Sequence, residues 1–240
     1  MDLVTILSRA AGVVAVAKPA GLATQAAAGV PSVEAWARRA IEVTSAAGYL
    51  GIPHRLDRAV SGVLLLAVTP RAARKLSRQF ERRQVRKTYL AVMAVSPAGL
   101  PALEAATEWQ DRVVKVPDEP RGRIAGVDEE GREAITLVRQ VAEIELGGES
   151  RAVVRLEPLT GRMHQLRLQA AARGMPIVGD SLYGGPPLPA GLAACTDLRA
   201  APILLHAWKI TYLDPDSGVP IEITAPLPDF WPAVAATAAG

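Results

Sequence analysis

The sequence predicts an α+β fold built on a mixed, mainly antiparallel sheet. Short apolar runs that are typical of buried strands alternate with capped, amphipathic helical segments along the 240 residues. At least two pairs of these runs are close enough in sequence to form antiparallel hairpins. The chain contains neither a glycine-rich phosphate loop nor a Rossmann fingerprint, which argues against a nucleotide cofactor.

The first part of the chain predicts two strands and two helices. A buried strand is expected over Val13–Ala17, ended by the turn Lys18-Pro19-Ala20-Gly21, and a second strand over Gly62–Val68. A helix is expected over Ser32–Ala46, with Ser32 as its N-cap. Thr69-Pro70 combines an N-cap with proline at the first helical position, so another helix should start there.

The second helix should have one apolar and one basic face. Ala72, Leu76 and Phe80 repeat every four residues and should pack against the core. Residues 71–87 carry eight cations and one acid, a net charge of +7, whereas the whole chain carries +3. This concentration of positive charge indicates a surface that binds a polyanion, and its alternative is an ordinary solvated helix face.

The remaining elements are expected to be mostly strands. They are strands over Thr88–Val95, Ala134–Leu146, Ala152–Pro158, Ile203–Leu213 and Pro220–Thr224, a helix from Thr160 to Arg173 closed by Gly174, and a short C-terminal helix over Pro228–Ala238. Residues 97–131 are rich in Pro, Gly and charge, so we expect an irregular insertion with one short strand near Val113–Val116.

Composition excludes several classes of protein. Half of the residues are hydrophobic, as in a globular domain, but the longest apolar run, Val63–Val68, is far shorter than the roughly 20 residues of a membrane span. The N-terminus lacks the features of a secretory signal, so we expect a cytoplasmic protein. One cysteine, Cys195, excludes an internal disulfide, and the three histidines are too dispersed to indicate a metal site.

Two polar strings point to chemistry. His54-Arg55-Leu56-Asp57-Arg58 places a carboxylate between two guanidinium groups at the entrance to a buried strand, where charge partners should keep Asp57 ionised. Alone, such a string is more typical of a structural ion pair at a strand entrance, because structural ion pairs are common. Thr160-Gly161-Arg162-Met163-His164-Gln165-Leu166-Arg167 places polar donors at a helix start, where Arg162 could pair with a carboxylate or simply belong to a surface helix.

Read in order, four strings resemble those of the RluA-type RNA pseudouridine synthases: H-R-L-D-x-x-x-S-G, K-T-Y-L-A, T-G-R-x-H-Q-L-R and G-M-P-I-V-G-D-S-L-Y-G. The resemblance extends to the turn at Lys18 and to Leu204-Leu205-His206-Ala207, and so spans roughly residues 10–225. It implies a bent sheet with flanking helices around a central RNA-binding cleft. It also implies a single catalytic domain over residues 1–240, without an upstream RNA-binding domain.

The resemblance assigns roles to individual residues. Asp57 falls on the catalytic aspartate, Tyr89 on the tyrosine that stacks on the target uracil, and Arg162 on the arginine that pairs with the carboxylate. Arg55 falls on the side chain that replaces the flipped-out base. Further contacts with RNA are expected from the basic surface and from both strings: His54, Arg71, Arg74, Lys75, Arg78, Arg82, Lys87, His164, Gln165 and Arg167.

Two positions depart from the family pattern. Val60 stands where the family usually has threonine, and Gln169 where it usually has histidine, so altered packing or RNA contacts are expected there.

The implied function is the isomerisation of uridine to pseudouridine in ribosomal RNA or tRNA, by a monomer without cofactor or metal. Asp57 could act as a nucleophile or assist loss of the base to a glycal-like intermediate, and the sequence does not decide between these routes. Two alternatives remain open. The first is a non-catalytic RNA-binding or ribosome-assembly factor. The second is an acid-dependent hydrolase, for which the strings show no second carboxylate.

Overall fold

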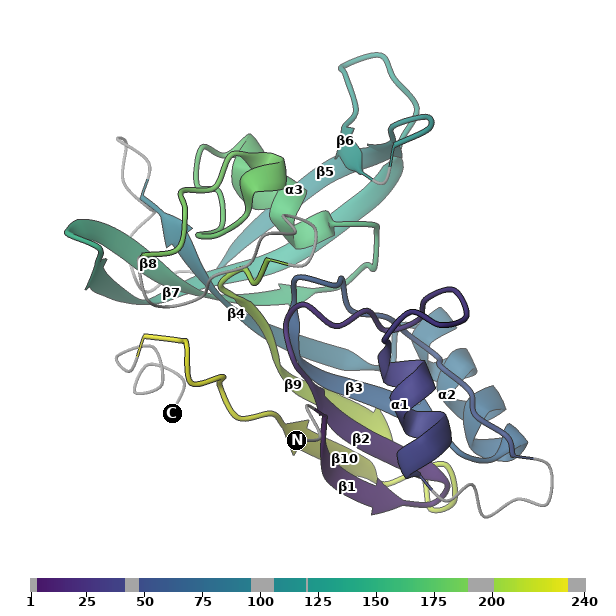
Figure 1. Ribbon diagram of the computed structural model, residues 1–240. Helices are drawn as coiled ribbons and strands as arrows, with labels where there is room; N and C mark the ends of the chain where they lie inside the picture. The colour runs from purple at the N-terminus through teal and green to yellow at the C-terminus, as the bar shows by residue number, and fades with distance from the viewer. Residues whose placement is uncertain (1–3, 42–47, 96–105, 120, 190–200, 233–240) are drawn as a thin grey trace. The chain divides into compact units, whose positions relative to one another are not determined.

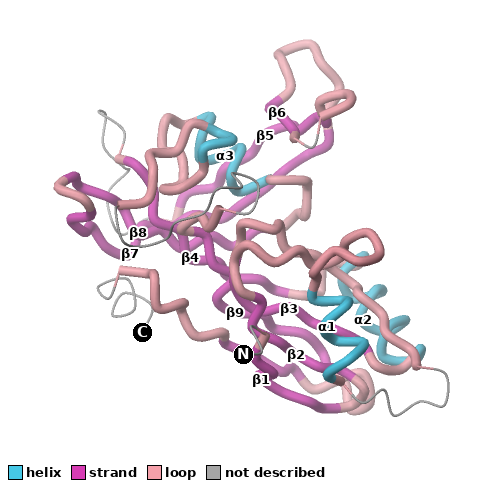
Figure 2. Tube along the Cα trace, in the orientation of Figure 1, coloured by secondary structure: helices cyan, strands magenta, loops and turns pink. Residues whose placement is uncertain are grey.

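In the computed structural model, residues 4–41, 48–95, 106–119, 121–189 and 201–232 are described. They divide into two compact units, and each is considered by itself. The first unit comprises residues 1–87, 199–201 and 206–228, and the second comprises residues 88–198, 202–205 and 229–240. Strands are the main element of both units, with few helices (Figure 1, Figure 2).

The first unit is built on strands β1 (Thr5–Ala10), β2 (Val13–Lys18), β3 (Ser61–Ala67), β9 (Leu205–Leu213) and β10 (Pro220–Thr224). They lie in the order β1-β2-β3-β9, with β10 beside β9. Most neighbours are antiparallel, and a short parallel pairing joins β3 to β9. Every residue of β3 is buried, as its continuous apolar run predicts for a central strand.

Strand β3 approaches β9 so closely at Gly62 that only glycine fits at this position. Gly62 has a φ of +123°, and a Cβ atom there would lie 2.3 Å from the carbonyl oxygen of Ala207. A side chain would therefore both strain the backbone and collide with it. Next to this contact, the buried Ser61 hydroxyl lies 2.8 Å from Nδ1 of His206. The two strands are thus tied by a backbone approach and by a side-chain hydrogen bond.

Helices α1 (Val33–Ala40) and α2 (Pro70–Glu81) begin where the sequence predicts. The Ser32 hydroxyl accepts a hydrogen bond from the Ala35 N–H, and the Thr69 hydroxyl accepts one from the Ala72 N–H. Helix α1 ends at Ala40, before the expected Ala46, and residues 42–47 lie outside the described part of the chain.

Helix α2 packs on β3 through Ala72 and Leu76, as predicted, whereas Phe80 is only half-buried. The buried Gln79 has the larger structural role. Its amide nitrogen donates to the carbonyl of Leu213 at 2.8 Å, and its amide oxygen accepts from the Leu213 N–H at 2.8 Å. This pair of bonds fastens α2 to the end of β9.

The second unit contains strands β4 (Arg86–Ala94), β5 (Thr107–Lys115), β6 (Gly122–Ile124), β7 (Arg132–Leu146) and β8 (Glu149–Pro158), in the order β4-β8-β7-β5-β6. All of these neighbours are antiparallel. The hairpin of β7 and β8 turns at Gly147-Gly148, whose φ angles of +65° and +77° suit the two-residue turns of such hairpins. The mixed, mainly antiparallel α+β fold is therefore confirmed.

The insertion over residues 97–131 is more regular than expected. Strand β5 covers nine residues and pairs with β7, and β6 adds a further strand to its edge. Trp109 and Val113 are buried while Gln110 and Arg112 between them are exposed, which is the alternation of a half-buried strand. The high charge of the segment obscured this pattern in the sequence.

Helix α3 (Gln165–Ala172) starts later than the predicted Thr160. His164 is its N-cap residue and has a left-handed backbone with a φ of +53°. The Thr160 hydroxyl instead accepts a hydrogen bond from the Ile135 N–H at 2.8 Å, which joins the chain to β7. The predicted end is confirmed, because Gly174 follows the helix with a φ of +69°. A short 3₁₀ helix, η1 (Ser181–Tyr183), comes next.

Replacing Gln79 by leucine should destabilise the first unit. The change puts an apolar side chain of similar size in the same space but leaves the Leu213 N–H and C=O without their amide partner. We expect the free energy of unfolding to fall by about 2 kcal/mol in chemical denaturation. The control Lys75→Gln, on the exposed side of the same helix, should change it by less than about 0.5 kcal/mol. Equal stability of both variants would contradict the role given to Gln79.

Candidate functional site

Asp57 lies on a turn that the segment from Lys18 to Thr24 holds in place. The Gly21 N–H donates to the Arg58 carbonyl at 2.8 Å, and Nε of Arg58 donates to the Gly21 carbonyl at 2.9 Å. On the other side of Asp57, the Thr24 hydroxyl bonds both the carbonyl and the N–H of Leu56. The half-buried carboxylate is therefore presented from a backbone that is fixed on both sides.

Lys18 is the cation that this arrangement places beside Asp57. Its side chain is 1% exposed, and its Nζ donates to the carbonyls of Pro19, Leu22 and Arg58 at 2.9, 2.7 and 3.3 Å. Burial lowers the pKa of Lys18 to about 7, and the charge of Asp57 partly opposes this shift. The ammonium group thus has its three hydrogen-bond acceptors and a nearby carboxylate.

Two neighbouring arginines, Arg55 and Arg58, were expected from the sequence to be the charge partners of Asp57, and Lys18 was assigned to a turn. Arg55 is exposed, and Nε of Arg58 donates to the Gly21 carbonyl, so the pairing of either guanidinium with Asp57 stays a prediction. Lys18 was missed because the residue is 39 positions away in sequence and reads as part of a Pro-Gly turn. The feature of the sequence that could have indicated Lys18 is a charged residue at the end of an otherwise apolar strand.

His54 has a structural role within the first unit. Its ring stacks on Phe80 with 4.7 Å between centroids, and its Nε2 accepts a hydrogen bond from the Leu65 N–H at 2.9 Å. Burial, followed by the charge of Lys87, lowers the pKa of His54 to about 3, so the ring is neutral at physiological pH. A neutral, stacked ring that supports β3 is a weaker candidate for RNA contact than the sequence suggested.

The basic face of α2 is exposed as predicted. Arg71, Arg74, Lys75 and Arg78 point away from the core, and exposed Arg82, Arg83 and Arg86 continue the series beyond the helix. We call these seven residues the basic ridge. Arg71 pairs with Asp216 at 3.1 Å on the surface. Lys87 is half-buried, and burial lowers its pKa to about 8, so it differs from the ridge residues.

In the second unit, Arg162 lies on the loop before α3. Its Nε donates to the carbonyl of Glu133 on β7 at 2.8 Å, and its backbone N–H donates to the side-chain oxygen of Gln165 at 3.0 Å. The Gln165 amide also donates to the carbonyl of Ile135 and the hydroxyl of Thr136. The loop that carries Arg162 is thus bonded to β7 by both backbone and side chain.

Two residues expected to contact RNA are buried instead. Gln165 is 4% exposed and makes the loop contacts just described. Arg167 is 6% exposed and forms two hydrogen bonds of 2.7 Å with the carboxylate of Asp180, which is also buried. The polar residues of the T-G-R-M-H-Q-L-R string suggested donors that face solvent. In helix α3, however, the side chains of Gln165 and Arg167 point into the protein, where each has internal partners.

Gln169, which replaces the usual histidine of the family, is completely buried. Its amide oxygen accepts from the Thr136 hydroxyl at 2.6 Å, and its nitrogen lies within hydrogen-bond distance of the Trp109 and Ala134 carbonyls and of Asp111. Asp111 also pairs with Arg173 at 2.9 Å. Gln169 thus bonds α3 to β5 and β7 through internal contacts, and whether it alters the packing relative to histidine stays a prediction.

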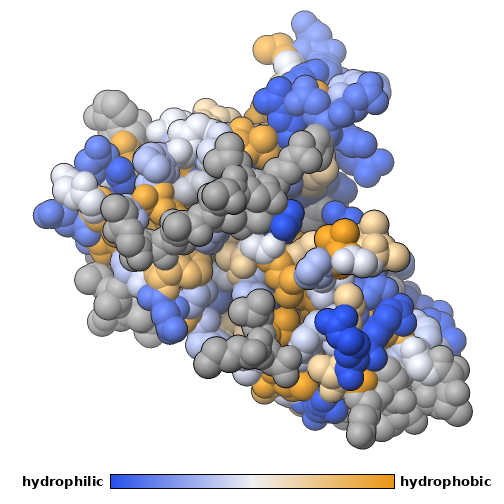
Figure 3. Space-filling view, viewed as in Figure 1, coloured by the Kyte–Doolittle hydropathy of each residue, from blue (hydrophilic) through white to orange (hydrophobic). Residues whose placement is uncertain are grey.

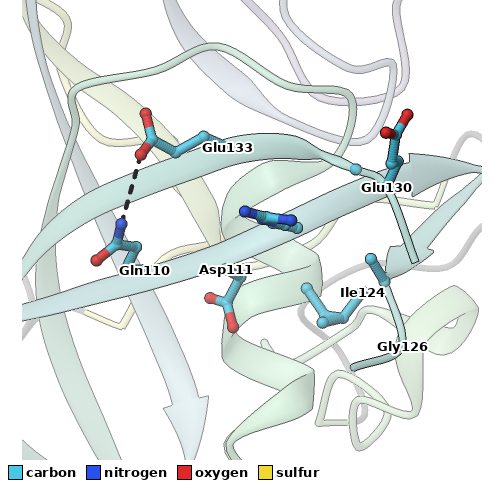
Figure 4. A pocket seen from close by; sticks show the side chains of 9 residues that line it. Gln110, Asp111, Ile124, Gly126, Glu130 and Glu133 are labelled. Atoms are coloured by element: carbon cyan, nitrogen blue, oxygen red, sulfur yellow. Dashed lines mark hydrogen bonds between the residues drawn. The ribbon is translucent and has the colours of Figure 1, made fainter. Parts of the chain in front are cut away.

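A pocket of about 670 Å³ lies on the second unit between β5, β6 and β7 (Figure 4). It is lined by Gln110, Asp111, Arg112, Glu130 and Glu133 together with smaller residues. Gln110 and Glu133 point toward each other and are joined by a long hydrogen bond of 3.4 Å (Figure 4). Three carboxylates against one guanidinium make this pocket unsuited to a phosphate group.

The hairpin of β5 and β6 is covered by hydrophilic side chains (Figure 3). Its exposed charges are of both signs and are partly paired with each other, as Arg123 with Glu129 and Arg121 with Glu119. This hairpin therefore lacks the one-sided charge that distinguishes the basic ridge.

Tyr89 lies on β4 opposite Leu156 of β8 and is half-buried. Tyr89 and Arg162 belong to the second unit and Asp57 to the first. That these three side chains meet therefore stays a prediction from the resemblance.

Among the described helices, none has the length and apolar character that a bilayer span requires. Within the same residues, no group of three or more His, Cys, Asp and Glu side chains is arranged to hold a metal ion.

Comparisons with known proteins agree with the strings identified in the sequence. A family model described as RNA pseudouridylate synthase matches residues 12–172. The chain is 35% identical over 176 residues to the dual-specificity RNA pseudouridine synthase RluA of Escherichia coli strain K12, covering 72% of this chain and 71% of that protein. It is 33% identical over 185 residues to tRNA pseudouridine synthase C of Salmonella typhi, covering 74% and 68%.

Solved structures show the same fold. Human RNA pseudouridylate synthase domain containing 1 matches with a TM-score of 0.72 and 24% identity, covering 94% of this chain and 84% of that one. Human RNA pseudouridylate synthase domain containing 4 matches with a TM-score of 0.69 and 24% identity, covering 94% and 89%.

The lowered pKa of the buried Lys18 should affect how the free energy of unfolding depends on pH. Its pKa is about 7 in the folded protein and 10.5 in the unfolded chain, so only the unfolded chain holds this proton between those values. Stability therefore rises with pH in that window by about 1.4 kcal/mol per unit from this group. In Lys18→Met, the slope of the unfolding free energy between about pH 8 and about pH 9.5 should fall by that amount.

The exposed control Lys75→Met should keep the slope of the wild type. An unchanged slope in Lys18→Met would show that Lys18 titrates normally in the folded protein. Lys87 and the tyrosines are present in all three proteins, so their contributions cancel in the comparison.

Proposed function

Because the chain belongs to the RluA-type RNA pseudouridine synthases and is an isomerase of uridines in RNA, we propose that Asp57 is its catalytic carboxylate. Arg162 is proposed to pair with this carboxylate, and Tyr89 to stack on the target uracil. The observation that carries the proposal is the fixed presentation of Asp57 on its turn, with the Lys18 ammonium beside it.

The reaction breaks the bond between ribose C1′ and uracil N1 and forms one between C1′ and C5, so it needs neither a redox cofactor nor an added group. An ionised carboxylate can attack the substrate or assist departure of the base, and both routes require Asp57 to be charged. Lys18 and Arg162 would stabilise that charge in a pocket from which the base excludes water. The Tyr89 ring can stack on the base while its hydroxyl exchanges a proton near the sugar.

A uracil within folded RNA is stacked and out of reach, so the base must rotate out of the helix into the site. Unstacking costs a few kcal/mol. The exposed Arg55, two residues before Asp57, is proposed to fill the gap left by the base. An exposed side chain suits this role better than the role of a permanent charge partner of Asp57.

The basic ridge is proposed to supply affinity for the RNA backbone. Seven exposed cations along and beyond α2 can neutralise successive phosphates without reading sequence. Structured ribosomal RNA or tRNA is the proposed substrate, in keeping with relatives named for tRNA and for the large ribosomal subunit. We propose that a single chain acts on this RNA in the cytoplasm.

Asp57→Asn should abolish turnover. The amide keeps the size of the carboxylate but carries no charge, so we expect the release of tritium from RNA labelled at uridine C5 to fall by at least about 1,000-fold. The control Asp118→Asn, at an exposed turn of the β5–β6 hairpin, should keep the wild-type rate. Binding of RNA by the wild type without any release of tritium would favour a non-catalytic RNA-binding protein.

Charge reversal at Arg74 and Arg78 should weaken RNA binding and make it less sensitive to salt. Loss of two phosphate contacts should flatten the slope of log affinity against log salt concentration by about 1.4 to 1.8. The matched control reverses Arg38 and Arg39, two exposed arginines of α1 outside the ridge, and so changes net charge equally. If both double variants had the same slope, overall charge rather than the ridge would set the affinity.

A further inference from the structure

Lys87, at the start of β4, is a half-buried cation that lacks an internal acceptor. Burial lowers the pKa of its ammonium group to about 8. Among the residues that the structure describes, none accepts a hydrogen bond from this group or forms an ion pair with it. Lys18 and Lys209 differ, since the first donates to three carbonyls and the second pairs with Glu222 at 3.5 Å. Folding thus removes water from the Lys87 ammonium without supplying an acceptor, which is unfavourable unless a ligand provides one.

His54 supplies a second donor beside this ammonium. Its Nε2 accepts a hydrogen bond from the Leu65 N–H at 2.9 Å, and because an N–H group can only donate, Nε2 carries no proton. The ring is neutral, since its pKa is about 3, so its single proton is on Nδ1. After burial, the charge of Lys87 is the second cause of this low pKa, which places the ammonium near the ring. Within the described part of the chain, the Nδ1–H group has no acceptor.

The donor of His54 has a fixed direction and a fixed place relative to Asp57. Its ring stacks on Phe80 with 4.7 Å between centroids, and the bond to Leu65 ties it to β3. Asp57 follows His54 by three residues, which span at most about 10 Å of chain. A neutral ring attracts RNA little by charge, but a ring held in this way can direct its N–H to one nearby acceptor.

The chemistry of the two donors suits a phosphate group. An ammonium and a neutral N–H can each donate to an anionic oxygen, and lysine is a common phosphate ligand. In the chain, Lys87 directly follows Arg86, the last residue of the basic ridge. The ridge residues are exposed and hydrated, whereas the desolvated Lys87 ammonium lies where the effective dielectric constant is lower and its attraction to an anion is stronger. One phosphate at this place should therefore be held more firmly than those along the ridge.

We propose that Lys87 and His54 together form a binding site for one phosphate of the RNA backbone, a few nucleotides from the target uridine. The inference rests on the proposed function, because it identifies the contact that sets the position of the RNA relative to Asp57. The ridge would attract the backbone at any register, and this site would select one phosphate.

RNA with single methylphosphonate linkages tests the proposal. Such a linkage replaces one charged phosphate oxygen by a methyl group, and it is introduced at each position of a tRNA or ribosomal RNA stem-loop in turn. On unmodified RNA, Lys87→Met should raise the Kd about tenfold, because one charged hydrogen bond is lost. At one linkage near the target uridine, the methylphosphonate should raise the Kd of the wild type about tenfold as well. It should have little further effect on Lys87→Met, since both changes remove the same contact.

The matched control Lys115→Met removes the same charge from an exposed position of β5 and should keep the wild-type profile of the scan. Wild-type affinity in Lys87→Met would overturn the proposal, because the lysine would then only pack its methylene stem. The proposal would equally fail if Lys87→Met kept every loss that the wild type shows in the scan.

Thermal unfolding separates this role from a structural one. Lys87→Met should unfold at the wild-type temperature or above it, because the change removes an ammonium group that has no internal acceptor. A clearly lower temperature would overturn the proposal, since Lys87 would then stabilise the fold.

The part of His54 is tested by NMR on protein labelled with ¹⁵N-histidine. The Nδ1 resonance of His54 should shift when unmodified RNA binds, and should not shift with RNA that carries the critical methylphosphonate. An unchanged resonance with unmodified RNA would overturn the role given to His54. Both the Kd and the resonance are measured without turnover. Absence of tritium release would therefore reject the catalytic proposal and leave this inference standing.

Discussion

The turn that presents Asp57 depends on two segments that are remote from it in sequence. From the N-terminal side, the stretch from Lys18 to Thr24 bonds the backbone on either side of the carboxylate. The same stretch accepts the first N–H groups of α1, through the carbonyls of Ala23 and Thr24. From the C-terminal side, β9 approaches Gly62 so closely that only a residue without a side chain fits. The backbone on both sides of the carboxylate is therefore held by contacts with the stretch from Lys18 to Thr24, one of which comes from the side chain of Arg58.

Elements whose signals are local could be predicted from the sequence. Both helix starts in the first unit followed from Ser32 and from Thr69-Pro70, because capping depends on residues within one turn. Strand β3 followed from an unbroken apolar run. Strand β5 did not, because its charged outward-facing residues resemble a loop until β7 supplies the pairing. The start of α3 was misplaced because Thr160, a good capping residue, bonds β7 instead.

Buried hydrogen bonds between residues far apart in the chain could not be predicted from the sequence either. Gln79 and Leu213 are 134 positions apart, and Ser61 and His206 are 145 apart. Nothing in either local sequence indicates its partner, because an amide or hydroxyl can face solvent equally well. The same ambiguity explains why Gln165 and Arg167 were read as RNA contacts, although burial gives each of them internal partners. For the site, the resemblance supplied candidate roles, and the structure added Lys18, which bonds the turn of Asp57.

On the proposed function, the two units would contribute to RNA recognition through different interactions. In the first, the basic ridge offers long-range attraction that salt weakens and that does not depend on a single geometry. In the second, the surface charges of the β5–β6 hairpin largely cancel, and order comes instead from short hydrogen bonds such as those of Arg162, His164 and Tyr183. On the proposed function, attraction to phosphates would bring any RNA to the protein, whereas side chains held in place by hydrogen bonds would contact only a group at the right position. Discrimination among RNAs should therefore depend more on the second unit, although most of the concentrated positive charge lies in the first.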